Sequence, residues 1–143
     1  MSNASEDTTP LGETELHAFA AALDAREAAL EGEVRDVNAV DQADREGFAG
    51  VAPDLVDVAE HRRGEDMRHA ERERDELELA EIGAARLRMA EGVYGQCTDC
   101  GEPIARARLQ AQPWAARCID CQEQHERVHG HAVPIVATGA DNR

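Results

Sequence analysis

Four cysteines in two closely spaced pairs are the residues of this sequence best suited to chemistry. They are all the cysteines of the 143-residue chain, with seventeen residues between the pairs: Cys97 and Cys100, then Cys118 and Cys121. Cysteine thiolates are preferred ligands of Zn²⁺, and two Cys-x-x-Cys pairs at this separation fit one tetrahedral site. Two disulfides or four unrelated thiols are the alternatives, but disulfides need an oxidising compartment. We therefore predict one structural zinc ion bound by these four cysteines.

A pair of acidic residues, Asp54 and Asp57, forms a second candidate site. Asp54 is suited to cap the start of a helix and Asp57 to favour the helix dipole, so a structural role alone accounts for both. Carboxylates exposed at a helix end are also suited to approach a metal ion or cationic groups. Hydrolysis by such a pair would need a pocket, a base and supporting residues that the sequence does not provide. We therefore expect no catalytic residue.

Two long helices are expected to position these sites. In the first, which begins at Thr14, apolar residues recur every seven positions: Leu16, Leu23, Leu30 and Val37. This spacing predicts one apolar stripe on a helix that packs against a single partner. Two glycines and a proline between Arg45 and Pro53 then predict a loop.

The second helix is expected from near Asp54 to about Glu91, where Gly92 and Gly95 end it. Its second half carries apolar residues at three-four-three spacing, which we expect to face the first helix: Leu77, Ala80, Ala84 and Leu87. Two long helices joined by a short loop lie antiparallel. From Asp57 to Glu91 the second helix would rise roughly 50 Å, so the hairpin is a finger.

The predicted fold is mainly α: a long antiparallel helical hairpin, or coiled-coil finger, on a small C4 zinc-finger module with a short C-terminal helix. The scarcity of aromatic residues, 3% of the chain, argues against a thick core. We divide the chain into a disordered tail at 1–13, the coiled coil at 14–91 with its tip near 46–59, the zinc module at 92–128 and a flexible tail at 129–143.

The formal charge of −15 limits the partners that this chain can have. Such a surface repels phosphate, which disfavours direct DNA or RNA binding. The sequence has no stretch long enough to span a membrane and no basic, apolar leader at its start, so we expect a cytoplasmic monomer. Three histidines near the C-terminus are not expected to form a second metal site, because four cysteines already complete one.

The motifs around the cysteines resemble a known family. The matching residues are Tyr94-Gly95-x-Cys97-x-x-Cys100-Gly101-x-x-Ile104, then Arg108-Leu109-x-Ala111-x-Pro113, then Cys118-x-x-Cys121-Gln122. This module is similar to the C4 zinc finger of the DksA/TraR family, bacterial factors that bind RNA polymerase rather than promoter DNA. Asp54, Asp57 and Ala59 match the Asp-x-x-Asp-x-Ala motif at the coiled-coil tip of DksA-like proteins, and Asp57 lies forty residues before Cys97, the family-like finger length.

The resemblance implies a transcription regulator that binds RNA polymerase through its secondary channel. It would place Asp54, Asp57 and Ala59 near the catalytic Mg²⁺ and modulate initiation without binding DNA. By the same resemblance Arg74 lies at a position of the finger that contacts polymerase, although a solvated helix charge explains it equally well. A DNA-binding zinc-finger protein and a protein–protein adaptor are the alternatives.

The sequence departs from the family at the positions that bind guanosine tetraphosphate. Family members combine with polymerase to bind this nucleotide through basic side chains. At the corresponding positions this chain has Glu81, Gln112 and Gln122, and it retains only Arg108. One guanidinium is a weak site for a highly charged phosphate ester. We therefore expect little response to the nucleotide.

Overall fold

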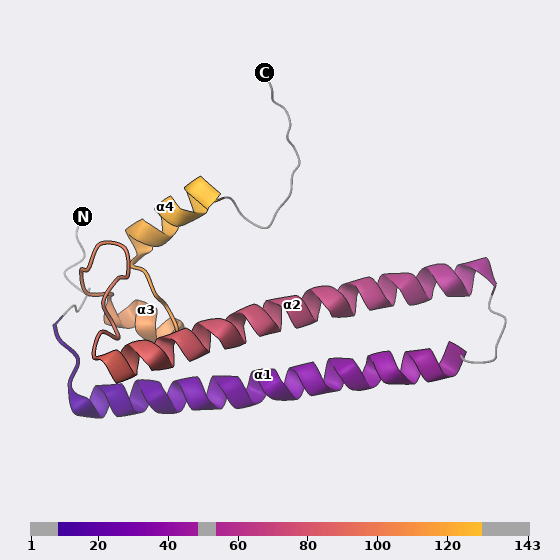
Figure 1. Ribbon diagram of the computed structural model, residues 1–143, viewed down its shortest axis with the longest axis horizontal. Coiled ribbons are helices and arrows are strands. Elements are labelled where there is room, and N and C mark those ends of the chain that lie inside the picture. Colours follow the sequence, from indigo (N-terminus) through magenta and orange to yellow (C-terminus); the bar gives the residue numbers. More distant parts are fainter. Residues whose placement is uncertain (1–8, 49–53, 130–143) are drawn as a thin grey trace, which may run out of the picture.

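The chain folds into a long helical hairpin on a small base, shown in Figure 1. The computed structural model describes residues 9–48 and 54–129. Helices α1 (Glu13–Phe48) and α2 (Leu55–Glu91) lie side by side and antiparallel and form the finger. Each is about 55 Å long at 1.5 Å per residue. The predicted antiparallel hairpin is therefore confirmed, while residues 49–53 of its predicted tip lie outside the described residues.

Both ends of α2 carry the capping groups that its sequence favours. The Asp54 side chain accepts a hydrogen bond of 2.8 Å from the backbone N–H of Asp57, which satisfies one of the free donors of the first turn. At the other end Gly92 is left-handed, with φ of 79°, and its N–H bonds back to the carbonyl of Met89. The helix therefore ends at the predicted glycine.

The first helix packs through the predicted stripe, but the second helix packs through a different one. Leu23 and Leu30 of α1 are fully buried, and in α2 the fully buried residues are Ile82 and Ala85. The predicted α2 stripe was wrong. Its leucines are largely exposed, Leu77 at 68% and Leu87 at 58%, and Ala80 and Ala84 are exposed too. Two apolar stripes lie on opposite faces of α2, and the one with the larger side chain at its centre, Ile82, faces α1.

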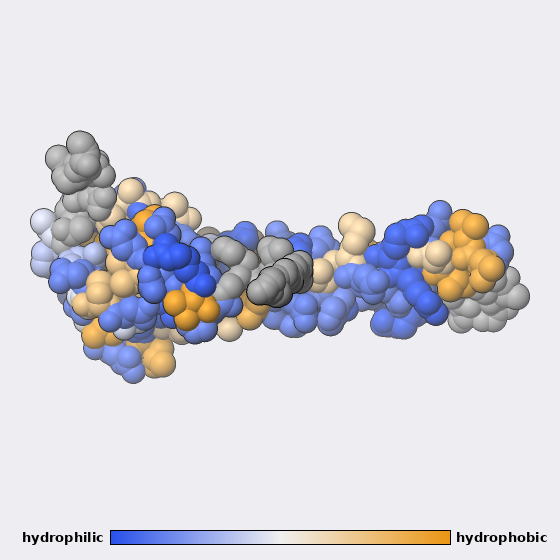
Figure 2. All heavy atoms as spheres, turned by 90° about the horizontal axis from the view of Figure 1, so that it is seen from above, coloured by the Kyte–Doolittle hydropathy of each residue, from blue (hydrophilic) through white to orange (hydrophobic). Residues whose placement is uncertain are grey.

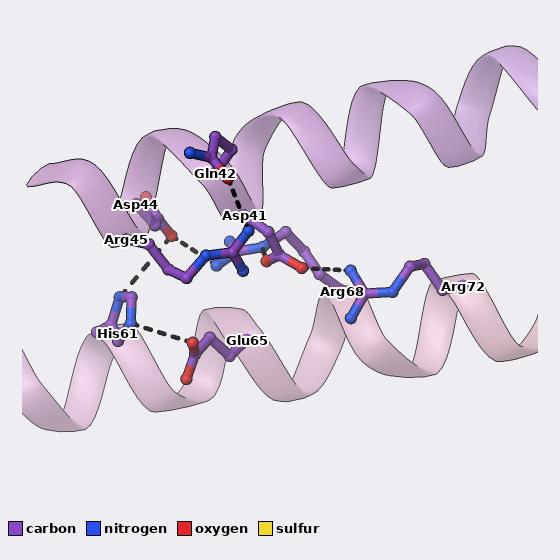
Figure 3. A network of polar contacts seen from close by, with 8 residues as sticks. All are labelled: Asp41, Gln42, Asp44, Arg45, His61, Glu65, Arg68 and Arg72. Carbon is purple, nitrogen blue, oxygen red and sulfur yellow. Dashed lines mark hydrogen bonds and ion pairs between the residues drawn. The ribbon is translucent and has the colours of Figure 1, made fainter.

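Farther from the base the finger replaces apolar contacts with ion pairs, shown in Figure 3. Asp41, only 9% exposed, accepts hydrogen bonds from Arg68 and Arg72 of α2. Arg68 also bonds Asp44 at 2.5 Å. We call these four residues the distal polar layer. They lie between the helices because each charge has a partner there, which offsets the cost of removing it from water.

The base, residues 92–129, packs onto the start of α1 and the end of α2. It contains α3 (Arg106–Ala111) and α4 (Ile119–His129). The Tyr94 ring lies 5.8 Å from that of Phe19, and its hydroxyl donates to the carbonyl of Pro113 at 2.7 Å. Ile104 and Leu109 complete the buried cluster. Helix α3 was not predicted, although Leu109 makes it part of the core.

Part of the predicted N-terminal tail lies against the base. Leu11 packs on the core, and Arg106 donates to the carbonyls of Thr9 and Pro10. The same guanidinium bonds Glu15 at 2.6 Å. The prediction of a disordered tail through residue 13 was therefore wrong for residues 9–13, because an apolar side chain and one arginine hold them. Residues 1–8 and 130–143 lie outside the described residues. Across the described ranges, no helix is both long and apolar enough to cross a bilayer.

Candidate functional site

Two turns of backbone bring the four cysteines together. In the first turn, the N–H of Gly101 bonds the carbonyl of Cys97 at 2.9 Å, and Gly101 has φ of 80°. This left-handed conformation favours glycine. In the second turn, Cys118 directly precedes α4 and Cys121 lies in its first turn. A hydrogen bond of 2.8 Å from the N–H of Thr98 to the carbonyl of Ala116 joins the two halves.

The four sulfur atoms form a cluster of the size that one zinc ion requires. All four lie within 4.8 Å of one another, and those of Cys100 and Cys118 are 3.9 Å apart. Tetrahedral coordination at a Zn–S distance of about 2.3 Å places sulfurs about 3.8 Å apart. The donor set is all thiolate and complete, which suits a structural site. These cysteines could therefore hold one structural zinc ion, as predicted.

The surroundings of the cysteines favour thiolates at the buried side of the cluster. Burial alone would raise the pKa of Cys97, but backbone N–H groups of Cys100, Cys118 and Asp99 outweigh it and lower the pKa to about 6. Contact with Cys118 and Cys97 instead raises the pKa of Cys121, which is only half-buried. Four neighbouring thiolates repel one another, and a divalent cation offsets that repulsion.

The predicted tip residues lie at the far end of the finger, where α2 begins. Asp54, Asp57 and Ala59 are all exposed. Between the two acids, Leu55 is 87% exposed and Val56 is 64% exposed. Figure 2 shows a hydrophilic surface along much of the finger and hydrophobic surface at the base and near the far end. The end of the finger therefore offers carboxylates and apolar side chains together.

Arg74 differs from the arginines nearest to it in α2. Arg68 and Arg72 are held in the distal polar layer, whereas Arg74 is exposed. Within the described part of the chain, no ion pair or hydrogen bond holds its guanidinium. Of these three arginines, Arg74 is the one whose charge faces outward.

The four positions considered for nucleotide binding line one cavity where α2 meets the base. Its volume is about 310 Å³, and Glu81, Arg108, Gln112 and Gln122 all contribute to its wall. Arg108 uses its Nε–H to bond the carbonyl of Arg117 at 2.8 Å. Burial, reinforced by the neighbouring Glu78, raises the pKa of Glu81.

Two further arginines line this cavity. Arg88, which the sequence did not single out, bonds the carbonyls of Trp114 and Ala115, and burial lowers its pKa. Arg117 bonds Asp99 at 2.8 Å. No spacing in the sequence relates Arg88 to residues 114–117, because only the packing of the base on α2 brings them together.

The zinc module has a counterpart among known families. Residues 92–127 match the model described as the prokaryotic dksA/traR C4-type zinc finger. The zinc module is therefore similar to the zinc finger of the DksA/TraR family. The chain is 38% identical over 74 residues to the RNA polymerase-binding transcription factor DksA of Caulobacter vibrioides, a match that covers 52% of each chain. It is 31% identical over 70 residues to the factor of the same name from Escherichia coli, covering 49% of this chain and 46% of the relative. The chain thus spans about half the length of the curated relatives it matches.

The likeness in structure extends beyond the zinc module. Transcription factor DksA2 from Pseudomonas aeruginosa has a solved structure that aligns with 90% of this chain and 95% of its own, with a TM-score of 0.72 and 26% identity. The finger and the base therefore occur together in a solved relative.

Proposed function

We propose that this protein is a transcription regulator that binds RNA polymerase and inserts its finger into the secondary channel. The observation that carries the proposal is the pair of exposed carboxylates, Asp54 and Asp57, at the end of a finger about 55 Å long, on a base of the DksA/TraR type. The relatives named RNA polymerase-binding transcription factors support the choice of partner. In this proposal the protein is a cytoplasmic monomer and has no catalytic site of its own.

The tip would act on the active centre rather than provide the affinity. One Asp54 oxygen caps α2, and Asp57 is exposed one turn later. Carboxylates beside a polymerase Mg²⁺ would alter the charges around the metal and the elements that move there. Docking contacts would come from the sides of the finger, where Arg74 is exposed, and from the base.

Direct DNA binding is the weaker candidate because the cations of the base are already engaged. Arg106 bonds Glu15, Arg117 bonds Asp99, and Arg108 bonds a backbone carbonyl. A DNA-binding face needs several exposed cations that contact phosphates. The charge of −15 opposes it further.

We also propose that guanosine tetraphosphate has little effect on this protein. The cavity that gathers Glu81 and Arg108 also contains the carboxylate of Glu126. Arg88 and Arg117 add positive charge, but both donate to groups of the protein itself. The cavity therefore offers few free donors to a pyrophosphate.

A double variant at the tip tests the proposal. Asp54→Asn with Asp57→Asn keeps the size of both side chains and most of the capping capacity, so α2 should form. We expect it to bind polymerase core within about twofold of the wild type, a difference of under ~0.5 kcal/mol, and to lose its effect on promoter transcription. Adding guanosine tetraphosphate to the wild-type reactions, with a polymerase that has no other site for it, should change little.

The matched control is Asp36→Asn with Asp66→Asn, which removes the same charge from exposed positions along the finger. This control should retain its effect on transcription. If binding and activity fall in parallel in the tip variant, the acids are docking contacts or caps. If the tip variant stays active, the proposed role of the motif is wrong.

A further inference from the structure

Two histidines at the C-terminal end of α4 lie in contact with each other. His125 and His129 are one turn apart, with their ring centroids 4.2 Å apart and their planes tilted by 31°. From the sequence we expected no second metal site at the C-terminal histidines, because four cysteines complete the zinc site. A complete cysteine site does not prevent other ligands from forming a separate site, and the contact between these two rings favours one.

The spacing of the two histidines suits one metal ion. Residues four apart are neighbours on one face of a helix, and His-Glu-x-x-His helices bind zinc through histidines at this spacing. Two nitrogens bound at right angles to one ion, each at about 2.1 Å, lie about 3 Å apart. Rings with centroids 4.2 Å apart can reach this separation by side-chain rotation, without a change in the helix.

The hydrogen bond of His129 leaves one of its nitrogens available to a metal ion. Its Nδ1 lies 3.1 Å from the backbone carbonyl of His125, and a carbonyl oxygen only accepts, so Nδ1 carries the proton. In the neutral ring the unshared electron pair is then on Nε2. Histidine ligands of metal ions commonly donate their other ring N–H to a carbonyl in this way, which fixes the ring and its tautomer.

The other described histidines have different neighbours on their helices. His61 and His69 of α2 each lie beside a glutamate one turn farther on, at 3.2 Å and 3.4 Å. His17 of α1 has the same kind of hydrogen bond as His129, at 3.1 Å from a backbone carbonyl four residues earlier, but the residue one turn farther on is alanine. Of the histidines that the structure describes, only His125 and His129 pair with each other.

The donor atoms and the surrounding charge determine which ion fits. Imidazole nitrogens suit Ni²⁺, Cu²⁺ and Zn²⁺, whereas Mg²⁺ and Ca²⁺ prefer oxygen ligands. The pair lies at the C-terminal end of α4, where the helix dipole favours a cation. The charge of −15 also attracts cations to the surface of this chain. A divalent transition-metal ion is therefore the expected ligand.

The arrangement supports binding of a metal ion rather than hydrolysis. Residues 125–129 read His-Glu-Arg-Val-His, which is the spacing of zinc peptidases that use the glutamate as general base. Here Glu126 accepts a hydrogen bond of 2.8 Å from Gln122 and lines the cavity between α2 and the base. Among the described residues, the cysteine cluster is the only group of three or more possible ligands, so the histidines supply two. Water would complete the coordination, and the ion would exchange with solution.

We infer that His125 and His129 form a second metal site, which binds one divalent transition-metal ion reversibly and is separate from the cysteine cluster. This inference does not depend on the proposed function, because both ligands belong to the free chain. The bound ion would join two successive turns of α4 and stabilise its C-terminal end.

Nickel binding to the zinc-loaded, full-length chain tests the inference. Equilibrium dialysis against Ni²⁺, with both metals measured by mass spectrometry, should give one zinc and one nickel ion per wild-type chain. His129→Gln should weaken nickel binding by about tenfold or more, because a single imidazole cannot chelate the ion. His129 is exposed, so α4 should form in the variant, which circular dichroism checks.

Two controls separate a chelating pair from the mere number of histidines. His17→Gln removes an exposed histidine that has the same kind of backbone contact, and it should bind nickel as the wild type does. Gln124→His with His129→Gln leaves the composition unchanged but puts the new histidine next to His125 in the sequence, where the two side chains do not face each other. This exchanged variant should bind nickel as weakly as His129→Gln. His131, outside the described residues, is kept in every chain.

The pattern of losses decides the outcome. Weaker nickel binding in both variants at position 129, with one zinc ion kept per chain, supports the second site. If either of these variants binds nickel as the wild type does, or if His17→Gln loses as much, the pair is not the ligand and the inference is overturned. Release of one zinc ion for each nickel ion bound would place the nickel in the cysteine cluster and would also overturn it.

Discussion

Asp41 is a carboxylate at a position where a coiled coil ordinarily has an apolar side chain. It lies between the helices and accepts from two arginines of α2, Arg68 and Arg72. The hydrogen bond from Arg68 is the largest cause that lowers the pKa of Asp41. A carboxylate with a lowered pKa stabilises the fold above its ordinary pKa, about 3.9, and this contribution is lost as the pH falls through the lower, folded value.

We predict that Asp41→Asn lowers the free energy of unfolding at pH 7, because Arg68 and Arg72 lose their shared acceptor. The difference between wild type and variant should shrink as the pH is lowered below about 4. Chemical denaturation followed by circular dichroism at each pH measures the two unfolding free energies. Any loss of zinc in acid affects wild type and variant alike. Asp36→Asn, at an exposed site of α1, is the control and should match the wild type. A difference that does not depend on pH would contradict this account.

At the scale of the helices, the sequence was sufficient to predict the packing face of α1 but not that of α2. In α1 one heptad stripe contains the large apolar residues, so the stripe could be predicted and Leu23 and Leu30 are buried. In α2, Leu77 and Leu87 compete with Ile82 on the other face, and hydrophobicity alone favoured the wrong face. Only the alignment of the helices, which the pairing of Arg68 with Asp41 helps to set, decides between them.

We predict that Ile82→Ala costs about 3 kcal/mol of unfolding free energy, since it leaves a cavity in the hairpin. Leu77→Ala should cost no more than about 0.5 kcal/mol, because its side chain is mostly in water. Thermal or urea unfolding of the two variants gives both values. Equal losses would mean that the Leu77 side chain is packed in solution.

At the scale of the whole molecule, the base and the finger share one core. Phe19 of α1 contacts Tyr94, and Arg106 of α3 bonds Glu15 of α1. The cysteine spacing was enough to predict the metal cluster, because few arrangements satisfy two Cys-x-x-Cys pairs. The spacing did not predict the contacts of residues 9–13, since one leucine and one arginine carry no periodic signal.

We predict that a strong chelator unfolds the base and leaves most of the helix content. Zinc binding supplies much of the folding energy of such modules. Helices α1 and α2 have 36 and 37 residues, against 6 and 11 in α3 and α4, so the far-ultraviolet signal should fall by a minor part. Emission from Trp114, the single tryptophan, should shift to longer wavelength. Cys118→Ser with Cys121→Ser should resemble the chelated protein; unchanged emission after zinc removal would contradict the prediction.

The fully buried apolar side chains of the hairpin lie near the base, so the far end of the finger tolerates changes of sequence. Among the described residues, the fully buried apolar side chains of the hairpin lie no farther out than Leu30 in α1 and Ile82 in α2. From Ile82 to Leu55 the finger continues for about 40 Å. Substitutions near Leu55 therefore alter what the protein presents to a partner while the folding of the base stays intact. The residues at the tip can accordingly be replaced, by evolution or by engineering, without changing the fold of the base.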